Sequence, residues 1–261
     1  MPVVTLTTDF GSKDYFVGAL KGELLKLYSN LTIVDVSHHI KPFNITEASF
    51  VLKNAYPSFP EGSVHVVTVN DQDDRIARYI AAEYEKHFFI GMDNGLFNMI
   101  FNHPPDGIAE LPAFMMNGTL TTYPGKKIFA KAACELALGK KIGELGKPVA
   151  ELTKRLGLEP VVQESLIRGT VIHIDSFQNV IVNITRELFS RVRGKRDFSI
   201  SYRSKRTEAI DTISESYYDV PQGYRLCLFN SSGYLEIAIH CGEAGSLLGL
   251  KVGDYVQIDF Q

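Results

Sequence analysis

The sequence has few cysteines, and they lie far apart. Cys134, Cys227 and Cys241 are the only three in 261 residues, and no Cys-x-x-Cys pair occurs. A disulfide framework needs more cysteines, and a thiolate metal site needs them closer together. Neither feature is therefore expected to organise the fold. This usage suits a reducing compartment, so we expect the protein in the cytoplasm.

The sequence also lacks a strong excess of charge and long apolar runs. It has 27 basic and 30 acidic residues, a formal net charge of −3, which gives no broad basic field for nucleic acid. No apolar run approaches the ~20 residues that span a bilayer. The N-terminus has no basic segment followed by an apolar one, as a secretory signal would. We expect neither nucleic acid nor a membrane as a partner.

Three widespread ligand or nucleophile motifs are missing as well. The chain contains no GxxxxGK[ST], GxGxxG or GxSxG, so it has no P-loop, Rossmann fingerprint or serine-hydrolase elbow. What is present is an ordinary globular composition, with 45% hydrophobic and 22% charged residues. The length suits one large or two modest domains with a real core.

The stretch over residues 2–22 organises the chain. An apolar, β-branched run at residues 3–8 predicts a buried strand, and apolar residues at helical spacing from Phe16 onward predict a helix. A strand, a polar turn and a helix form the first half of a βαβ unit, in which ligands bind at the carboxyl end of the strand. Asp9, in that turn, is placed to accept two hydrogen bonds from a diol such as ribose. The alternative is that Asp9 only caps the turn.

Strands and helices alternate up to about residue 140. The periodicity predicts strands at residues 31–36 and 64–69, helices at 45–56 and 128–138, and a hairpin at 80–84 and 87–91. This order predicts an α/β N-terminal domain with a mostly parallel sheet over residues 1–150.

The pattern changes after Pro148. Residues 151–165 are polar, with a glycine and a proline, and predict a linker. Beyond it, residues 166–261 contain short strands between Gly, Asn and Asp turns, and one short helix at 186–192. The strands are expected at residues 167–174, 180–184, 198–202, 225–229, 234–239 and 255–260. Closely spaced short strands predict a small all-β barrel.

A charged loop follows the strand expected at residues 64–69. Its carboxylates Asp71, Asp73 and Asp74 could hold Mg²⁺, because clustered carboxylates at a strand end suit a hard cation. A solvated acidic loop explains the same residues. We favour the solvated loop and expect no metal.

Six stretches spread over essentially the whole chain resemble the S-adenosyl-L-methionine (SAM) hydroxide adenosyltransferase family, relatives of the chlorinase and fluorinase that act on the same sulfonium. They are TTDFGSKDYFVGALKG (7–22), IVDVSHHIKPFNITEASFVL (33–52), FPEGSVHVVTV (59–69), MDNGLF (92–97), IDSFQNVIVNI (174–184) and NSSGYLEIAI (230–239). The resemblance implies an α/β domain, a β-barrel domain and a homotrimer with no cofactor. The ligand, SAM or adenosine, would lie between one subunit's first domain and a neighbour's second.

The resemblance also implies roles for individual residues. The carboxylate matching Asp9 would hold the ribose hydroxyls. Residues matching Asp175, Phe177 and Asn179 would meet the methionine amine and the adenine.

Further residues belong to the same implied binding set. Ser231 and Ser232 would lie near the methionine carboxylate, and Tyr217 or Tyr218 would stack on the adenine. The alternative for Phe177 and Tyr218 is packing in the core of the barrel. The remaining residues expected to bind substrate are Phe10, Phe43 and Glu236.

The sequence departs from the family at the positions that carry its reaction. That reaction is attack of water or hydroxide on C5′ of the ribose, which expels methionine as a neutral thioether. The site must therefore orient and deprotonate water, and the family does so with an Asp–Arg–His set. Here Asn70, Ala77 and Pro124 stand at these positions, and none of these side chains can act as a base.

Three hypotheses follow. In the first, which we prefer, the loop that begins at Asn70 has taken over: Asp71 or Asp73, with Arg75 or Arg78, holds the water, and SAM is hydrolysed to adenosine and L-methionine. In the second, the protein binds SAM or adenosine without turnover. In the third, the carboxylates of residues 71–74 make it a metal-dependent hydrolase.

Overall fold

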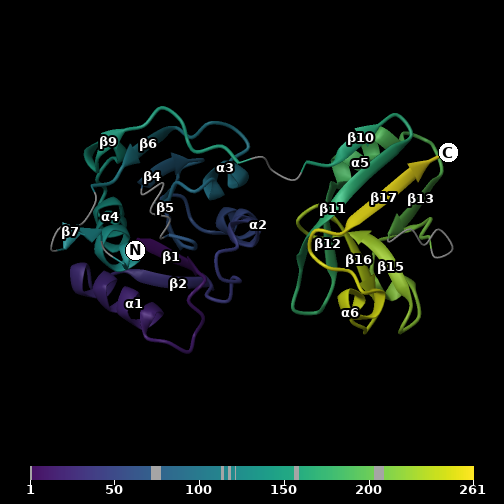
Figure 1. The fold of residues 1–261 in the computed structure, drawn as a ribbon, viewed down its shortest axis with the longest axis horizontal. Helices are drawn as coiled ribbons and strands as arrows, with labels where there is room; N and C mark the ends of the chain where they lie inside the picture. Colours follow the sequence, from purple (N-terminus) through teal and green to yellow (C-terminus); the bar gives the residue numbers. More distant parts are fainter. Residues whose placement is uncertain are drawn as a thin grey trace. The chain divides into compact units, whose positions relative to one another are not determined.

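The chain forms two compact units, Met1–Arg155 and Leu156–Gln261, in a computed structural model (Figure 1). The structure describes residues 2–71, 78–112, 122–155, 159–202 and 209–261, together with the backbone of 115–116 and 119–120. Each unit has its own hydrophobic core. Among the described residues, no helix is long and apolar enough to cross a bilayer.

The first unit is built on a seven-stranded sheet with the order β2-β1-β3-β5-β4-β6-β9. Its strands are β1 (Val3–Thr8), β2 (Thr32–Ser37), β3 (Val64–Thr68), β4 (Tyr79–Tyr84), β5 (His87–Met92), β6 (Gly107–Glu110) and β9 (Lys147–Pro148). Its helices are α1 (Phe16–Leu27), α2 (Ile45–Ala55), α3 (Leu96–Ile100) and α4 (Ala130–Ala137). Shorter elements are the 3-10 turns Tyr56–Ser58 and Ile142–Glu144, the π-helical turn Gly125–Phe129, and a hairpin of β7 (Met115–Met116) and β8 (Thr119–Leu120).

This sheet is only partly parallel. β1 pairs in parallel with β2 and β3, and β3 with β5. β4, β6 and β9 join antiparallel, so the expectation of a mostly parallel sheet is met in one half alone. The reason lies at Glu85 and Lys86, which connect β4 to β5 and both have positive φ, 49° and 63°. Such a two-residue turn makes a tight hairpin, whose strands are antiparallel.

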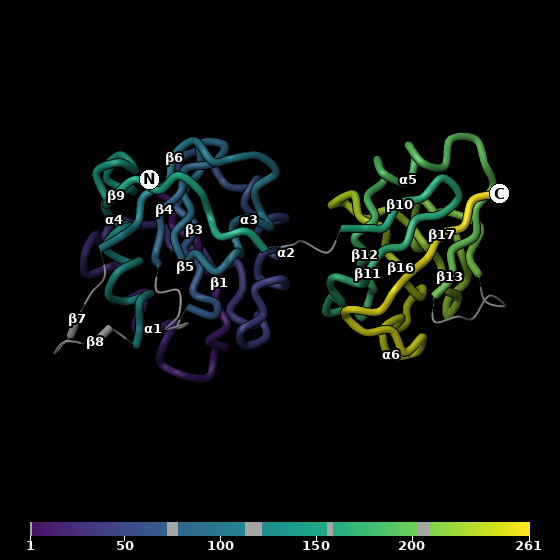
Figure 2. Tube along the Cα trace, turned by 45° about the horizontal axis from the view of Figure 1, so that its top comes forward, coloured from purple at the N-terminus to yellow at the C-terminus, as the bar shows by residue number. Residues whose placement is uncertain are grey.

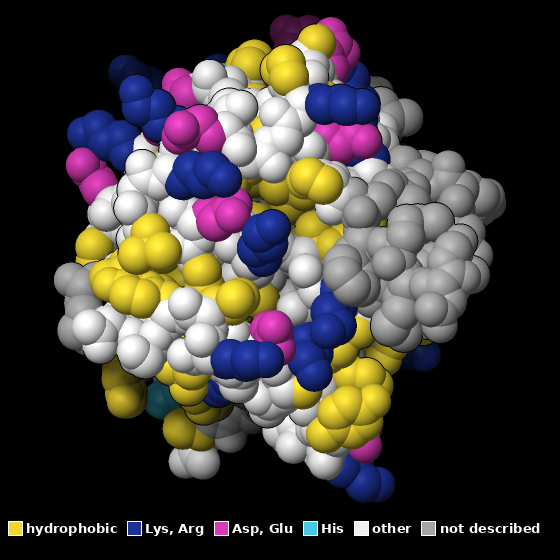
Figure 3. Space-filling view, turned by 90° about the vertical axis from the view of Figure 1, so that its left-hand side faces the viewer, with side chains coloured by type: hydrophobic (Ala, Val, Ile, Leu, Met, Phe, Trp, Pro, Cys, Tyr) yellow, Lys and Arg dark blue, Asp and Glu magenta, His cyan; other side chains and the backbone are white. Residues whose placement is uncertain are grey.

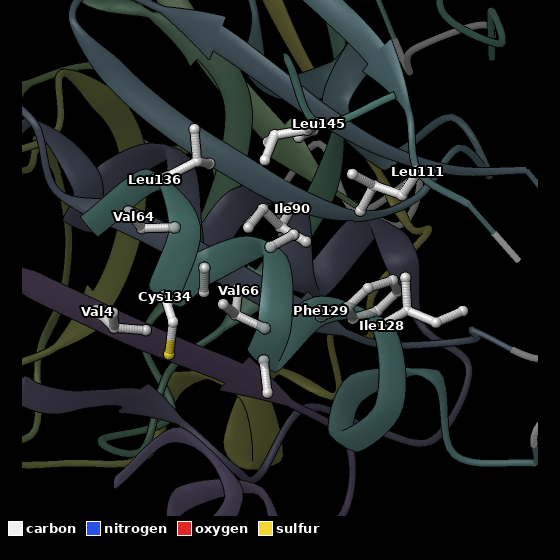
Figure 4. Packing of buried hydrophobic residues seen from close by; sticks show 14 of the residues in the cluster. Val4, Val64, Val66, Ile90, Leu111, Ile128, Phe129, Cys134, Leu136 and Leu145 are labelled. Carbon is white, nitrogen blue, oxygen red and sulfur yellow. The ribbon is translucent and has the colours of Figure 1, made fainter. Parts of the chain in front are cut away.

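Helices cover both faces of the sheet. Side chains alternate along a strand, so Val64 and Val66 pack against α1 and α4, in the cluster drawn in Figure 4. Val67, on the opposite face, packs with α2 and α3. The described helices thereby bury the sheet on both sides, which leaves the ends of its strands for polar groups.

The second unit is an eight-stranded sheet with two helices. Its strands are β10 (Val161–Gln163), β11 (Leu166–Ile174), β12 (Val180–Thr185), β13 (Phe198–Tyr202), β14 (Ile213–Ser214), β15 (Arg225–Phe229), β16 (Tyr234–Ile239) and β17 (Tyr255–Phe260). Its helices are α5 (Arg186–Arg193) and α6 (Ala244–Leu248), with a 3-10 turn at Tyr217–Asp219. β10 lies within residues 151–165, where the sequence predicts a linker, and pairs with β11.

The sheet of the second unit curls because β11 changes partner along its length. Residues 166–170 of β11 pair with β17, and residues 171–174 pair with β12; Figures 1 and 2 both show β17 between β11 and β13. Ile200 in β13, at one end of the strand order, also forms an isolated bridge with Ile210, which lies shortly before β14 in the chain. The expected all-β barrel is thus met only as a curled sheet, and Phe189 of α5 fills its core.

Candidate functional site

Four strands of the first unit end at one edge of its sheet. β1, β2, β3 and β5 are linked by parallel pairing, so the residues that follow them gather there. These residues are Asp9, His38, Asn70 and Asp93. One face of the molecule is shown in Figure 3, where acidic and basic side chains are intermixed rather than gathered by sign.

Asp9 ties together the loops after β1, β2 and β3. Its Oδ2 accepts hydrogen bonds from the backbone N–H of Phe43, at 2.9 Å, and of Asn70, at 3.4 Å. Both donors have positive φ, 66° and 50°, which few residues other than glycine adopt. Asp9 therefore organises two distant loops, which the alternative of a simple turn cap does not explain. Phe43 itself is exposed.

The loop after β2 is held by a second polar chain. Thr8 Oγ1 lies 3.0 Å from His38 Nδ1, and His38 Nε2 lies 3.0 Å from Asp35 Oδ1. Lys21 donates to the other oxygen of Asp35 at 2.6 Å. Although burial acts to raise the pKa of Asp35, the bonds from Lys21 and His38 lower it overall. This chain fixes the backbone that leads to Phe43.

Asp71 is the most unusual group at this edge. Its side chain is 6% exposed, and its Oδ2 has no hydrogen-bond partner among the described residues. Burial, together with the nearby charge of Asp9, raises the pKa of Asp71 to about 7. A carboxyl with such a pKa can take up a proton at neutral pH.

Two threonines at the same edge share this lack of partners. Thr7 Oγ1 and Thr68 Oγ1 are buried without a hydrogen bond among the described residues. Gly125 packs directly on Thr68: a Cβ at position 125 would lie 2.7 Å from Thr68 Cγ2. Thr7 pairs in register with Val67 and Thr68 with Thr8, so the two hydroxyls lie on opposite faces of the sheet. Buried polar atoms are nearly always paired in folded proteins, so the unpaired atoms make the carboxyl end of the sheet the candidate place for a ligand.

An aromatic cluster lies beside these polar groups. The ring of Phe10 packs at 5.4 Å from Phe16 and edge-on at 5.5 Å from Tyr123, and Tyr15 stacks on Phe16 at 4.5 Å. Tyr123 donates its hydroxyl hydrogen to the carbonyl of Phe16. Burial and the charge of Asp71 raise the pKa of this phenol well above its usual range. Sequence reasoning missed Tyr123, whose only signal is its place beside Pro124, at the substituted histidine position.

Arg78 is engaged elsewhere than the sequence predicts. Its guanidinium donates to Asp93 through Nε at 2.8 Å and through a terminal nitrogen, which also donates to the Glu151 carbonyl at 3.2 Å. Asp93 accepts in addition from the backbone N–H of Thr153 at 2.9 Å. This ion pair anchors the segment around residue 151, and Arg78 would have to leave it to hold a water.

Several expected residues lie outside the described part of the chain, namely Asp73, Asp74, Arg75 and Ala77. Among the residues that are described, no three His, Cys, Asp or Glu side chains gather as a metal site would require. Pro124, which the sequence resemblance places at a histidine position, precedes the π-helical turn that leads into α4.

Asn94, which sequence reasoning also missed, braces the loop after β3 from the neighbouring strand. It is 5% exposed, and its Nδ2 donates to the carbonyls of Val69 and Asn70, each at 3.1 Å. The signal available in the sequence is its position in MDNGLF, two residues after a strand.

In the second unit, Asp175 builds a tight turn. Its Oδ1 accepts from the backbone N–H of Phe177 at 2.9 Å and of Asn179 at 2.8 Å, and the Asn179 side chain donates to Oδ2 at 3.2 Å. The turn presents the Phe177 ring to solvent, 79% exposed. Packing in the core is therefore excluded for Phe177.

Glu236, which is buried, bonds to residues next to others that are expected to bind substrate. It accepts from the hydroxyl of Tyr217 at 2.6 Å and from the side chain of Asn230 at 3.2 Å. Burial raises the pKa of Glu236, these two bonds lower it, and the charge of Asp175 raises it further, with a net increase. The influence of Asp175 shows that its turn and Glu236 are electrostatic neighbours.

The remaining expected residues of this unit are exposed. Ser231 and Ser232 lie at the surface, and the N–H of Ser232 donates to the side chain of Asn230 at 3.1 Å. Tyr218 is 82% exposed, with its ring edge-on to His240 at 5.2 Å, so it too is no core residue. The second unit thus presents polar turns and two free aromatic faces.

Comparison with known proteins gives matches along the whole chain. The model of the SAM hydroxide adenosyltransferase N-terminal domain matches residues 4–146, and that of the C-terminal domain matches residues 169–257. The (R)-S-adenosyl-L-methionine hydrolase of Methanocaldococcus jannaschii is 31% identical over 99% of this chain and 96% of its own. That of Thermus thermophilus is 30% identical over 99% and 100%. A solved structure of an uncharacterized conserved protein from Thermotoga maritima superposes with a TM-score of 0.87 at 28% identity, covering 98% of this chain and 99% of that one.

Proposed function

Because the chain belongs to the SAM hydroxide adenosyltransferase family, we propose that it hydrolyses SAM to adenosine and L-methionine. Two relatives at 30–31% identity over nearly their full length are named (R)-S-adenosyl-L-methionine hydrolase. The family supplies the reaction class. The question specific to this chain is which group handles the water, since Asn70 and Pro124 stand where the family has an acid and a histidine.

The observation that carries the proposal is the buried Asp71 carboxyl beside Asp9. Its unpartnered Oδ2 and its pKa of about 7 suit a group that accepts a proton from water at neutral pH. In the proposed step, the water oxygen bonds to C5′ while the C5′–S bond breaks. The electron pair of that bond goes to sulfur, which leaves as the neutral thioether of methionine, and the water proton passes to Asp71. No general acid is required.

Asp9 would hold the ribose hydroxyls in this reaction. Phe43 and Asn70 already bond to its Oδ2, so its position is fixed before substrate arrives, and a carboxylate makes strong charge-assisted bonds to a diol. Phe10 and Tyr123 would form an apolar wall that keeps bulk water from the reacting carbon.

We propose that the second unit recognises the two ends of the substrate. The turn of Asp175 to Asn179 would meet the methionine amine and the adenine, and Ser231 and Ser232 the methionine carboxylate. The exposed rings of Phe177 and Tyr218 have free faces on which an adenine can stack. As the family resemblance implies, these groups would act on substrate held by a neighbouring copy in a homotrimer.

The second candidate is binding of SAM or adenosine without turnover. It is favoured by Asn70 and Pro124, which remove the family's acid and histidine, and by the ion pair to Asp93 that occupies Arg78. In that case Asp71 would stay protonated and serve as a hydrogen-bond donor to bound ligand.

The deciding experiment is incubation of the purified protein with SAM, with adenosine and methionine measured by HPLC. Stoichiometric release of both supports hydrolysis. Calorimetric binding of SAM with no adenosine, even at high protein concentration, supports the binder. Loss of release on adding EDTA, restored by Mg²⁺, would instead support the metal-dependent alternative that uses Asp71, Asp73 and Asp74.

A further inference from the structure

Asn94 uses all of its side-chain hydrogen-bonding groups on backbone. It is the second residue after β5 and is 5% exposed. Its Nδ2 donates one hydrogen each to the carbonyls of Val69 and Asn70, both at 3.1 Å. Its Oδ1 accepts from the N–H of Leu96 at 3.2 Å, at the start of α3. An amide is well suited to this place, because it carries two donors and an acceptor on one planar group.

The backbone that Asn94 holds is a sharp bend. Asn70 has φ 50°, a left-handed conformation that a non-glycine residue keeps only when its surroundings favour it. The N–H of Asn70 donates to Asp9, and its carbonyl accepts from Asn94. The residue is thereby held on both sides, and Asp71 is the next residue in the chain.

Asp71 follows the bend directly, is 6% exposed, and lies close enough to Asp9 for the two carboxyls to interact. The neighbouring ion pair cannot replace this brace, since Asp93 bonds to Arg78 and to Thr153 rather than to residues 69–71 in the described contacts.

We infer that Asn94 is a positioning residue, which holds the bend at Asn70 so that the Asp71 carboxyl stays beside Asp9 and faces the water that attacks C5′. The inference rests on the proposed hydrolysis. In this role Asn94 acts through the carbonyls of Val69 and Asn70, to which its side chain donates.

The test compares two variants at this position with a matched control. Asn94→Ala removes both donors and the acceptor. Asn94→Asp keeps the acceptor that serves Leu96 but replaces the donors by a second oxygen. Asn54→Ala is the control, because Asn54 also donates from Nδ2 to a carbonyl, that of Phe50 at 2.7 Å, within α2.

For Asn94→Ala we expect the adenosine-releasing kcat to fall at least tenfold, since an ångström-scale misplacement of a catalytic group has large effects on rate, while KM changes less than about threefold. A looser bend lets Asp71 move into water and away from Asp9. The acidic limb of kcat/KM should therefore move to lower pH by about one unit. Asn94→Asp should keep its melting temperature within a few degrees and lose kcat, and Asn54→Ala should match the wild type in both.

The other outcomes distinguish a failure of the proposed hydrolysis from a failure of the positioning role. If wild-type protein releases no adenosine, the proposed function fails. If it does, but Asn94→Ala keeps the wild-type kcat and the wild-type pH limb, the positioning role is wrong. If neither variant folds, Asn94 is a structural residue and the inference is overturned as well.

Discussion

Buried polar groups at the two ends of β1, β3 and β5 differ in whether they have hydrogen-bond partners. Toward the amino ends of β1, β3 and β5, Thr5 Oγ1 lies 2.7 Å from His65 Nδ1, and His65 Nε2 lies 3.2 Å from His87 Nδ1. At the carboxyl ends, Thr7, Thr68 and Asp71 keep buried oxygens without partners among the described residues. Both ends are closely packed, but only one is internally satisfied.

The comparison shows how to tell a structural polar cluster from a site. A chain of threonine and two histidines that bond to each other stabilises the sheet and has little left to offer a ligand. Oxygens left unpaired cost free energy in the folded protein, so the end of the sheet that carries them is the end at which added hydrogen bonds would stabilise the protein most. Substitutions at each end of the strands test this contrast.

The largest effect is expected for Asp71→Asn. An amide cannot accept the proton of water, so adenosine release should fall by about 10²–10⁴-fold, the usual contribution of a general base. Stability at pH 8 should rise, because a buried charge beside Asp9 is removed. Product measurement by HPLC and urea denaturation at pH 8 check the two parts. An active Asp71→Asn variant would remove Asp71 from the mechanism.

Asp9→Asn should weaken binding of SAM and of adenosine by about ten- to hundredfold, because bonds to a charged group contribute about 1.5–3 kcal/mol. It should also lower the pKa of Asp71, since the charge of Asp9 helps to raise it, and so move the acidic limb of kcat/KM to lower pH. Calorimetry and a pH series measure these effects. Asp106→Asn, the same change at an exposed residue before β6, should leave both unchanged.

The two ends should respond to pH with opposite sign. Burial and the neighbouring His87 lower the pKa of His65 to about 3, and burial lowers the pKa of His87. The unfolded chain, whose histidines titrate near pH 6.5, then binds more protons than the folded one, so their contribution to stability is lost as pH falls below about 6.5, by up to ~1.4 kcal/mol per pH unit and histidine. The raised pKa of Asp71 means that the folded chain binds more protons than the unfolded chain between about pH 4 and 7. The contribution of Asp71 to the free energy of unfolding therefore falls as pH rises through this range.

Urea denaturation between pH 5 and pH 8 separates these contributions. His65→Gln should flatten the fall in stability toward acid, and His103→Gln, at an exposed histidine, should not. Asp71→Asn should remove the loss of stability that Asp71 causes as pH rises. Parallel curves for wild type and His65→Gln would show that the histidine pair titrates as it does in the unfolded chain.

The smallest effect comes from a matched pair of threonines in the same sheet. Thr5→Val removes the partner of the buried His65 and should cost about 1–3 kcal/mol of unfolding free energy. Thr68→Val removes a hydroxyl without a partner among the described residues and should be neutral or slightly stabilising in the absence of substrate. Equal losses for both would contradict the contrast between the two ends of the strands.

Much of the fold is readable from local pattern alone. The strands expected at residues 198–202, 225–229, 234–239 and 255–260 coincide with β13, β15, β16 and β17, because alternation and turn residues are local signals. The hairpin expected at residues 80–84 and 87–91 is also found, as β4 and β5. The sequence does not predict the antiparallel strands β6 and β9, because they are short and carry little local pattern.

The site is readable only in part. The position of Asp9 after the first strand predicts a ligand-facing carboxylate, but its donors, Phe43 and Asn70, lie 34 and 61 residues away. The bond between His65 and His87 depends on strand register, which sequence spacing does not give. Arg78 finds its partner in Asp93 through tertiary packing alone. The sequence therefore suggests which residues belong to the site, but it does not give the long-range contacts that they make.

The left-handed backbone at Asn70 has an evolutionary consequence. Aspartate tolerates this conformation about as well as asparagine does, and one base change in an asparagine codon gives aspartate. The bend at position 70 could therefore accommodate an aspartate without refolding. A carboxylate could appear at position 70 in a single mutational step, directly before Asp71.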